Sequence, residues 1–284
     1  MQNVLLIIFG VISILALYTG FRVWQTEKRH GPTGEFRTVD GVLLHFHRRM
    51  PSSVPQGLPP LVFIHGASGN ALDPMIAFLD HFDDAYDLIF VDRPGHGHSE
   101  RKAAKHSDPM QQAQSISALL GALGISKYIV VGHSRVAALP VVGFLFSWTI
   151  TLPVAERLAN ASIQGVFSPD AAPVDYGEEV KLPLLFRPSS FRANAQDVAN
   201  LNVRLAEQSR RYSEIVQPAV VITGTKDSVV WPSIHSDGLM RDLQDARMVV
   251  LEGAGHMPHH SHGAQISKEI KTLMMSLRSE RPPN

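Results

Sequence analysis

Three side chains of the sequence could together carry nucleophilic catalysis, because each follows a short apolar run typical of a buried strand. The three are Ser134 after residues 128–131, Asp227 after residues 219–223, and His256 after residues 248–251. A serine at a tight turn off a strand exposes its hydroxyl, and Gly132 favours such a turn because it has no side chain. His256 would take the proton of Ser134, and Asp227 would accept a hydrogen bond from His256 and hold its ring.

Each of these residues also has a purely structural interpretation. A lone Gly-x-Ser is often a strand that ends in a polar turn. A lone aspartate is usually a turn or cap residue, and a lone histidine is usually structural. The catalytic interpretation of Ser134, Asp227 and His256 therefore depends on their order after strands and on partner motifs elsewhere in the chain.

Five glycine-containing motifs follow apolar runs along the chain. They are His-Gly-Ala-Ser-Gly at residues 65–69, Asp-Arg-Pro-Gly-His-Gly-His-Ser at 92–99, Gly-His-Ser at 132–134, Gly-Thr-Lys-Asp at 224–227 and Gly-Ala-Gly-His at 253–256. In these motifs the sequence resembles the α/β-hydrolase family, over roughly residues 36–277. The resemblance implies the α/β fold class, with a mostly parallel central sheet flanked by helices and a helical cap. It also implies a catalytic triad of Ser134, Asp227 and His256.

The resemblance further implies where a negatively charged reaction intermediate would be stabilised. The matching oxyanion-hole donors are the backbone N–H groups of Ala67 and Arg135, which can contribute a few kcal/mol each. A small, apolar ester or related acyl compound is the expected substrate, and neither a cofactor nor a metal is expected. A serine nucleophile argues against the epoxide and haloalkane branches of the family, which use aspartate. Hydrolysis of C–C bonds and cofactor-free perhydrolysis stay open.

The segment after Ser134 departs from the family pattern. The fifth position of the Gly-x-Ser-x-Gly elbow is Val136, whose β-branched side chain adds bulk where the turn packs closely. Pro140 would interrupt the following helix after about one turn. We therefore predict that roughly 30 residues, one helix and one strand with their loops, are missing or shortened after the nucleophile. The alternative function is a catalytically inactive, membrane-anchored relative of the fold, acting as a binding module or arising by deletion.

The first segment of the chain is apolar enough to cross a bilayer. Residues 2–21 carry no charged side chain, and a spanning helix needs roughly 20 residues. Tyr18, Phe21 and Trp24 would then lie at the membrane interface. The alternative, a cleaved signal peptide, is disfavoured because the segment has no basic start and no clean small-x-small cleavage site. The basic residues that follow predict, by the positive-inside rule, a single-pass protein whose soluble domain is cytoplasmic.

A second uncharged stretch occupies residues 136–155. Pro140 and Pro153 interrupt it, so a pocket-lining or lipid-facing cap is favoured over a second membrane span. An apolar cap next to a membrane anchor favours an apolar substrate. The expected organisation is an anchor and juxtamembrane segment at 1–30, the first part of the core at 31–135, the cap at 136–214 and the second part of the core at 215–284.

Local signals predict several elements that would position these loops. Asp40-Gly41 between two apolar runs predicts a β-hairpin. Asp108 followed by Pro109 predicts a helix start, with the helix running to about residue 123. Residues 194–208 are expected to form a cap helix, and residues 266–277 the closing amphipathic helix.

Composition excludes several other classes of function. The chain has 284 residues, with 26 basic and 26 acidic side chains and no cysteine. The balanced charge gives no indication of nucleic-acid binding, and the lack of cysteine excludes disulfides and thiolate chemistry. His259, His260 and His262 lie near His256, but no carboxylate or cysteine stands at a recognisable ligand spacing. A polar helix start is therefore predicted there rather than a metal site.

Overall fold

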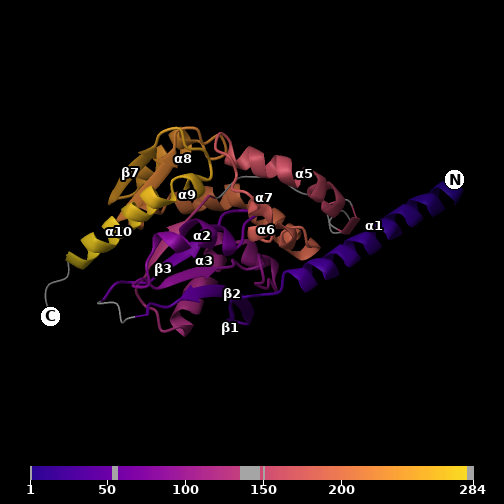
Figure 1. Ribbon diagram of the computed structural model, residues 1–284, viewed down its shortest axis with the longest axis horizontal. Helices are drawn as coiled ribbons and strands as arrows, with labels where there is room; N and C mark the ends of the chain where they lie inside the picture. The colour runs from indigo at the N-terminus through magenta and orange to yellow at the C-terminus, as the bar shows by residue number, and fades with distance from the viewer. Residues whose placement is uncertain (1, 53–56, 135–147, 150, 280–284) are drawn as a thin grey trace.

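The computed structural model describes residues 2–52, 57–134, 148–149 and 151–279, and its strands lie in two sheets (Figure 1). The strands are β1 (Glu35–Val39), β2 (Val42–Arg49), β3 (Leu61–Ile64), β4 (Leu88–Val91), β5 (Ile129–Gly132), β6 (Ala219–Gly224) and β7 (Ala246–Leu251). The helices are α1 (Gln2–Arg29), α2 (Leu72–Phe78), α3 (Pro109–Ala122), α5 (Thr151–Phe167), α6 (Tyr176–Glu179), α7 (Pro188–Ser209), α8 (Pro232–Asp242), α9 (Pro258–Ser261) and α10 (Gly263–Ser279).

The larger sheet has the strand order β1-β2-β4-β3-β5. Strands β3, β4 and β5 run parallel, while β1 and β2 form an antiparallel edge. The parallel arrangement places the carboxyl ends of β3, β4 and β5 at one edge of the sheet. The loops at residues 65–69 and 92–99 and the turn at Ser134 all begin at that edge, which is where open α/β sheets bind ligands.

The sequences of β3 and β4 explain why they lie at the centre of this sheet. Both are apolar throughout, as is typical of parallel strands covered on both faces. Phe63 and Phe90 point into one hydrophobic cluster, whereas Val62 and Ile89 point into another. Because successive side chains of a strand point to opposite faces, these two clusters are the cores on the two sides of the sheet.

Most of the locally predicted elements are confirmed. Val39 pairs with Val42 across a tight turn in which Asp40 and Gly41 have φ values of +49° and +76°, the left-handed geometry that the hairpin signal predicts. The carboxylate of Asp108 accepts a hydrogen bond from the N–H of Met110 at 2.8 Å and caps α3. Helices α7 and α10 cover the predicted ranges but begin earlier, at Pro188 and Gly263.

The sheet is divided after β5. Strands β6 and β7 pair in parallel with each other and form a separate two-stranded sheet. All regular elements described between residues 148 and 218 are helical, so the described chain supplies no strand between β5 and β6. This agrees with the predicted loss of an interior strand. The predicted shortening of the helix after the nucleophile, with Val136 and Pro140, concerns residues outside the described part.

A cavity of about 820 Å³ lies between the two sheets. Its walls include Val131 of β5, Ile222 of β6, and Ile270 and Leu273 of α10. Val130 of β5 is 56% exposed, although a β-branched residue in an interior strand is normally buried. The division of the sheet therefore leaves an apolar slot along β5.

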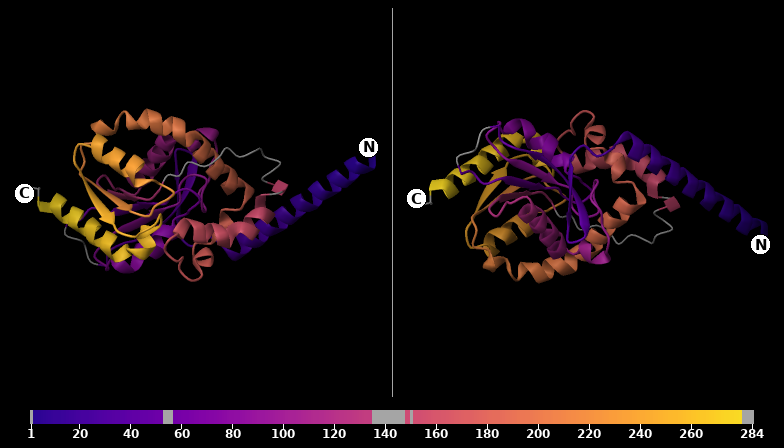
Figure 2. Two further views of the ribbon diagram at one scale, coloured as in Figure 1. Left: turned by 90° about the horizontal axis from the view of Figure 1, so that it is seen from above. Right: turned by 90° about the horizontal axis from the view of Figure 1, so that it is seen from below.

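Helix α1 projects from the rest of the molecule, and the first part of α5 approaches it (Figure 1; Figure 2). Two side chains of α1 join it to α5: the Tyr18 hydroxyl and Arg22 Nε each donate a hydrogen bond to Glu156, at 2.7 Å. The projecting part carries exposed leucine, isoleucine, valine and phenylalanine side chains. Among the described helices, α1 alone is long and apolar enough to cross a membrane.

Candidate active site

Ser134 lies two residues after the end of β5, and its backbone φ is +36°. For a residue with a side chain this left-handed conformation costs roughly 1 kcal/mol. A sharp turn directly after a central strand imposes such strain, and it is the geometry in which a serine nucleophile is presented. The Ser134 hydroxyl is buried and makes no hydrogen bond to another described residue. Catalytic hydrogen bonds are often loose before substrate binds.

His256 and Asp227, which are 29 residues apart in the sequence, meet in the structure. Nδ1 of His256 lies 2.9 Å from Oδ2 of Asp227, and the two side chains are 5% and 11% exposed. Nδ1–H of the imidazole donates to the carboxylate, which leaves Nε2 free to accept a proton. Burial alone would raise the pKa of Asp227, but hydrogen bonds from His256 and the Val230 N–H lower it, so the carboxylate stays ionised.

The loop at residues 224–227 and the loop at residues 253–256 are in close contact, which brings Asp227 and His256 together. A Cβ atom added to Gly224 would lie 2.3 Å from the carbonyl oxygen of Ala254, a distance that no side chain tolerates. Oδ1 of Asp227 accepts hydrogen bonds from the N–H groups of Val229 and Val230, both at 2.8 Å. The loop therefore fixes one carboxylate oxygen and leaves the other for His256.

The turn at residues 132–134, here called the elbow, also contacts the loop at residues 253–256, here called the histidine loop. Nε2–H of His133, the residue before Ser134, donates to the carbonyl oxygen of His256 at 2.8 Å. The rings of His133 and His256 have their centres 5.0 Å apart. The structure thus places the Ser134 turn and His256 side by side.

The loop after β3 is held so that its backbone faces the elbow. The carbonyl oxygen of Gly66 accepts hydrogen bonds from His65 Nδ1 at 2.8 Å and from Arg93 Nη2 at 2.9 Å. In a planar trans peptide the next N–H, that of Ala67, points the opposite way. A Cβ atom on Gly66 would lie 3.1 Å from the carbonyl oxygen of Ser134, so glycine permits this close approach. The second predicted oxyanion donor, Arg135, lies outside the described residues.

Asp92 holds several of these loops by hydrogen bonds, a role that the sequence analysis did not assign to it. Its buried carboxylate accepts hydrogen bonds from His45 Nδ1 at 2.7 Å and from the N–H groups of Ala71 and His98 at 2.7 and 2.8 Å. Burial would raise its pKa, but these hydrogen bonds and the nearby imidazoles lower it to about 2. In the sequence it was marked only as the first residue of the motif at 92–99, directly after an apolar run.

A second buried carboxylate, Asp197 of α7, joins the cap to the core. It lies 3.0 Å from Arg93 Nη1, 3.0 Å from His96 Nε2 and 2.5 Å from Arg101 Nη2. Arg93 is the residue that also holds the Gly66 carbonyl. Asp197 therefore links the cap helix to the loop that carries Ala67, a connection that no sequence motif indicated.

Because His96 is buried in its neutral form, we expect the protein to become less stable in mild acid. Burial and the neighbouring Arg93 lower the pKa of His96 to about 4, while an unfolded chain titrates near 6.5. Between these values the unfolded state binds more protons, so the free energy of unfolding falls as pH drops from about 6.5 to 4, by about 3 kcal/mol for His96 alone. Urea unfolding at several pH values measures this slope.

Two variants separate this effect from general acid sensitivity. His96→Gln removes the titrating group, so its stability should depend less steeply on pH than that of the unmodified chain. His235→Gln replaces an exposed histidine of α8 and should leave the slope unchanged. Equal slopes in all three proteins would contradict the prediction.

Comparison with known proteins agrees with this architecture. The model of the alpha/beta hydrolase family matches residues 61–269. A relative from Haemophilus influenzae, named "Putative esterase/lipase", is 24% identical over 248 residues, which cover 76% of this chain and 83% of that protein. A 100-residue match, 34% identical, covers 35% of this chain but only 25% of an acetyltransferase component of the acetoin cleaving system from Cupriavidus necator.

The fold also matches solved structures. The crystal structure of a membrane phospholipase A, described as a bacterial virulence factor, superposes with a TM-score of 0.64 at 18% identity. The match covers 98% of this chain and 99% of that one. From the five motifs, the sheet and the family match over most of its length, the chain belongs to the alpha/beta hydrolase family.

Proposed function

We propose that this protein is a membrane-anchored serine hydrolase that cleaves an ester or related acyl bond of a small, apolar substrate. Ser134 is the nucleophile, His256 the general base and Asp227 the residue that orients it. The N–H groups of Ala67 and Arg135 form the oxyanion hole. The observation that carries the proposal is the buried His256–Asp227 pair, 2.9 Å apart, beside a serine in a strained turn.

The reaction follows from these roles. Nε2 of His256 takes the Ser134 proton while Oγ attacks the acyl carbon, and Asp227 stabilises the imidazolium that forms. The oxyanion of the tetrahedral intermediate is stabilised by the two backbone donors. Its collapse expels the alcohol, which receives the proton from His256. Water, activated by the same imidazole, then releases the acid from the acyl-enzyme.

An apolar substrate is supported by the position of the cap. Helix α5 contacts α1 through Glu156, at the end of the apolar part of α1. Val154, Leu158 and Val166 of α5 are 45%, 54% and 38% exposed, and their spacing places them along one stripe of the helix. If α1 spans a bilayer, this stripe lies near its surface, where an amphipathic helix binds. By the positive-inside rule that surface is the cytoplasmic one.

A catalytically inactive protein is the second candidate. Two observations favour it: the Ser134 hydroxyl makes no hydrogen bond to a described residue, and the sheet is divided beside the elbow. Such a protein would retain the fold as a membrane-anchored binding module.

Labelling with a fluorophosphonate separates the two candidates. The reagent reacts with a serine only when a base and an oxyanion hole activate it. We expect the full chain in detergent to be labelled, and Ser134→Ala and His256→Ala to lose the label. Ser126→Ala, at an exposed serine just before β5, should be labelled like the unmodified chain. A folded protein that takes no label would favour the inactive candidate.

A further inference from the structure

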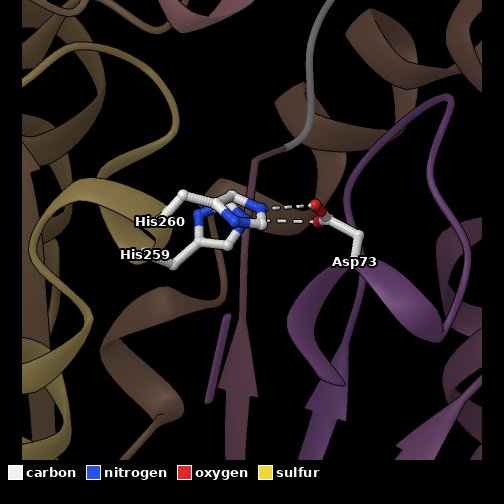
Figure 3. A group of neighbouring side chains, drawn as sticks. All are labelled: Asp73, His259 and His260. Carbon is white, nitrogen blue, oxygen red and sulfur yellow. Dashed lines mark hydrogen bonds and ion pairs between the residues drawn. The ribbon is translucent and has the colours of Figure 1, made fainter. Parts of the chain in front are cut away.

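A second cluster of functional side chains lies beside the proposed triad. Asp73 of α2 and the adjacent His259 and His260 of α9 converge on one point (Figure 3). Nε2 of His259 lies 3.2 Å from Oδ2 of Asp73, and Nε2 of His260 lies 2.9 Å from Oδ1. One ligand atom from each residue can be chosen so that all three lie within 4.8 Å of one another.

We propose that Asp73, His259 and His260 bind a divalent transition-metal ion, with Zn²⁺ the best match. Two imidazoles and a carboxylate form a donor set that zinc commonly uses, with a fourth position for water or another oxygen. Ligand atoms 2.0–2.2 Å from a tetrahedral zinc lie about 3.3 Å from one another. The two observed oxygen–nitrogen separations are close to that value, so small side-chain movements would admit the ion.

Burial and charge at this cluster suit a cation. The side chains of Asp73, His259 and His260 are each about 5% exposed. An ionised carboxylate and a neutral imidazole are the forms that bind metals. The Tyr176 hydroxyl donates to Oδ1 of Asp73 at 2.8 Å and would orient this ligand.

The position of the cluster indicates a structural role for the ion. His259 is three residues after His256, and its ring centre lies 4.2 Å from that of His133 in the elbow. Asp73 lies in the first turn of α2, the helix that follows the loop of Ala67. A metal here would join α9, beside the smaller sheet, to α2, beside the larger one. It would fix the two loops that carry the proposed base and oxyanion donor.

Metal binding is tested on the full chain in detergent. After treatment with a chelator and addition of ZnCl₂, desalted protein is analysed for zinc by mass spectrometry, and thermal unfolding is followed in parallel. We expect one zinc per chain and a Tm higher by a few degrees with zinc present. Co²⁺ in place of zinc should give the visible absorption of a four-coordinate ion.

Variants assign the ion to these residues. His260→Gln and the double variant His259→Gln/His260→Gln should lose both the bound zinc and the Tm shift, as should Asp73→Asn if it folds. His262→Gln, at a neighbouring histidine outside the cluster, should retain both. The proposal is overturned if the unmodified chain binds no stoichiometric zinc, or if the double variant binds as much. Neither result depends on hydrolase activity.

Discussion

Replacing Asp227 by asparagine is expected to lower the rate of ester hydrolysis by about four orders of magnitude, with little change in fold. Oδ1 of Asp227 accepts two backbone N–H groups, and only Oδ2 faces His256. The amide oxygen of asparagine would keep the backbone contacts, and its NH₂ group would then point at Nδ1 of His256. That arrangement forces the proton onto Nε2, which can no longer accept the proton of Ser134.

The measurement is hydrolysis of a p-nitrophenyl ester by purified protein, with thermal unfolding as a check of folding. Asp170→Asn provides the matched control, because Asp170 also contacts the histidine loop: its carboxylate accepts the Gly255 N–H at 3.3 Å but does not touch the His256 ring. We expect that variant to retain most of its activity. Similar rates for Asp227→Asn and the unmodified chain would remove Asp227 from the mechanism.

Replacing Asp197 by alanine is expected to lower the free energy of unfolding by about 3–5 kcal/mol. The side chains of Arg93, Arg101 and Asp197 are 9%, 7% and 10% exposed. Without the carboxylate, the guanidinium groups of Arg93 and Arg101 lose this buried negative charge, and α7 loses one of its polar contacts with the core. Because Arg93 also holds the Gly66 carbonyl, hydrolysis should slow as well.

Denaturant unfolding of Asp197→Ala and of Asp237→Ala checks this prediction. Asp237 is an exposed aspartate of α8, and its removal should change the free energy of unfolding by less than about 0.5 kcal/mol. A loss below about 1 kcal/mol for Asp197→Ala would mean that water, rather than the carboxylate, satisfies the two arginines.

The features that could be predicted from the sequence are those that depend on a few adjacent residues. Short apolar runs set the strands, and the polar residues directly after them reach the same sheet edge because the strands are parallel. For this reason the neighbourhoods of Ser134, Asp227 and His256 were predictable. The hairpin at Asp40 and the cap at Asp108 were predictable for the same reason, since each depends on a few adjacent residues.

The buried polar centres were not predictable in this way. Asp73 and His259 are 186 residues apart, and Asp92 and Asp197 bind partners from several loops. No spacing within the sequence reports such contacts, because they arise only when the cap and both sheets are packed. Asp73 lies so far from His259 in the sequence that the spacing of residues around His256 gives no sign of it.

The divided sheet has a consequence for how the molecule folds. In a continuous sheet, the ladder of backbone hydrogen bonds makes neighbouring strands gain and lose structure together. Among the described residues the ladder stops at β5, so coupling between residues 35–132 and 219–279 relies on side-chain and loop contacts, including those of α2 with α9 and α10. We therefore expect two cooperative units joined by packing, each of which can open while the other persists.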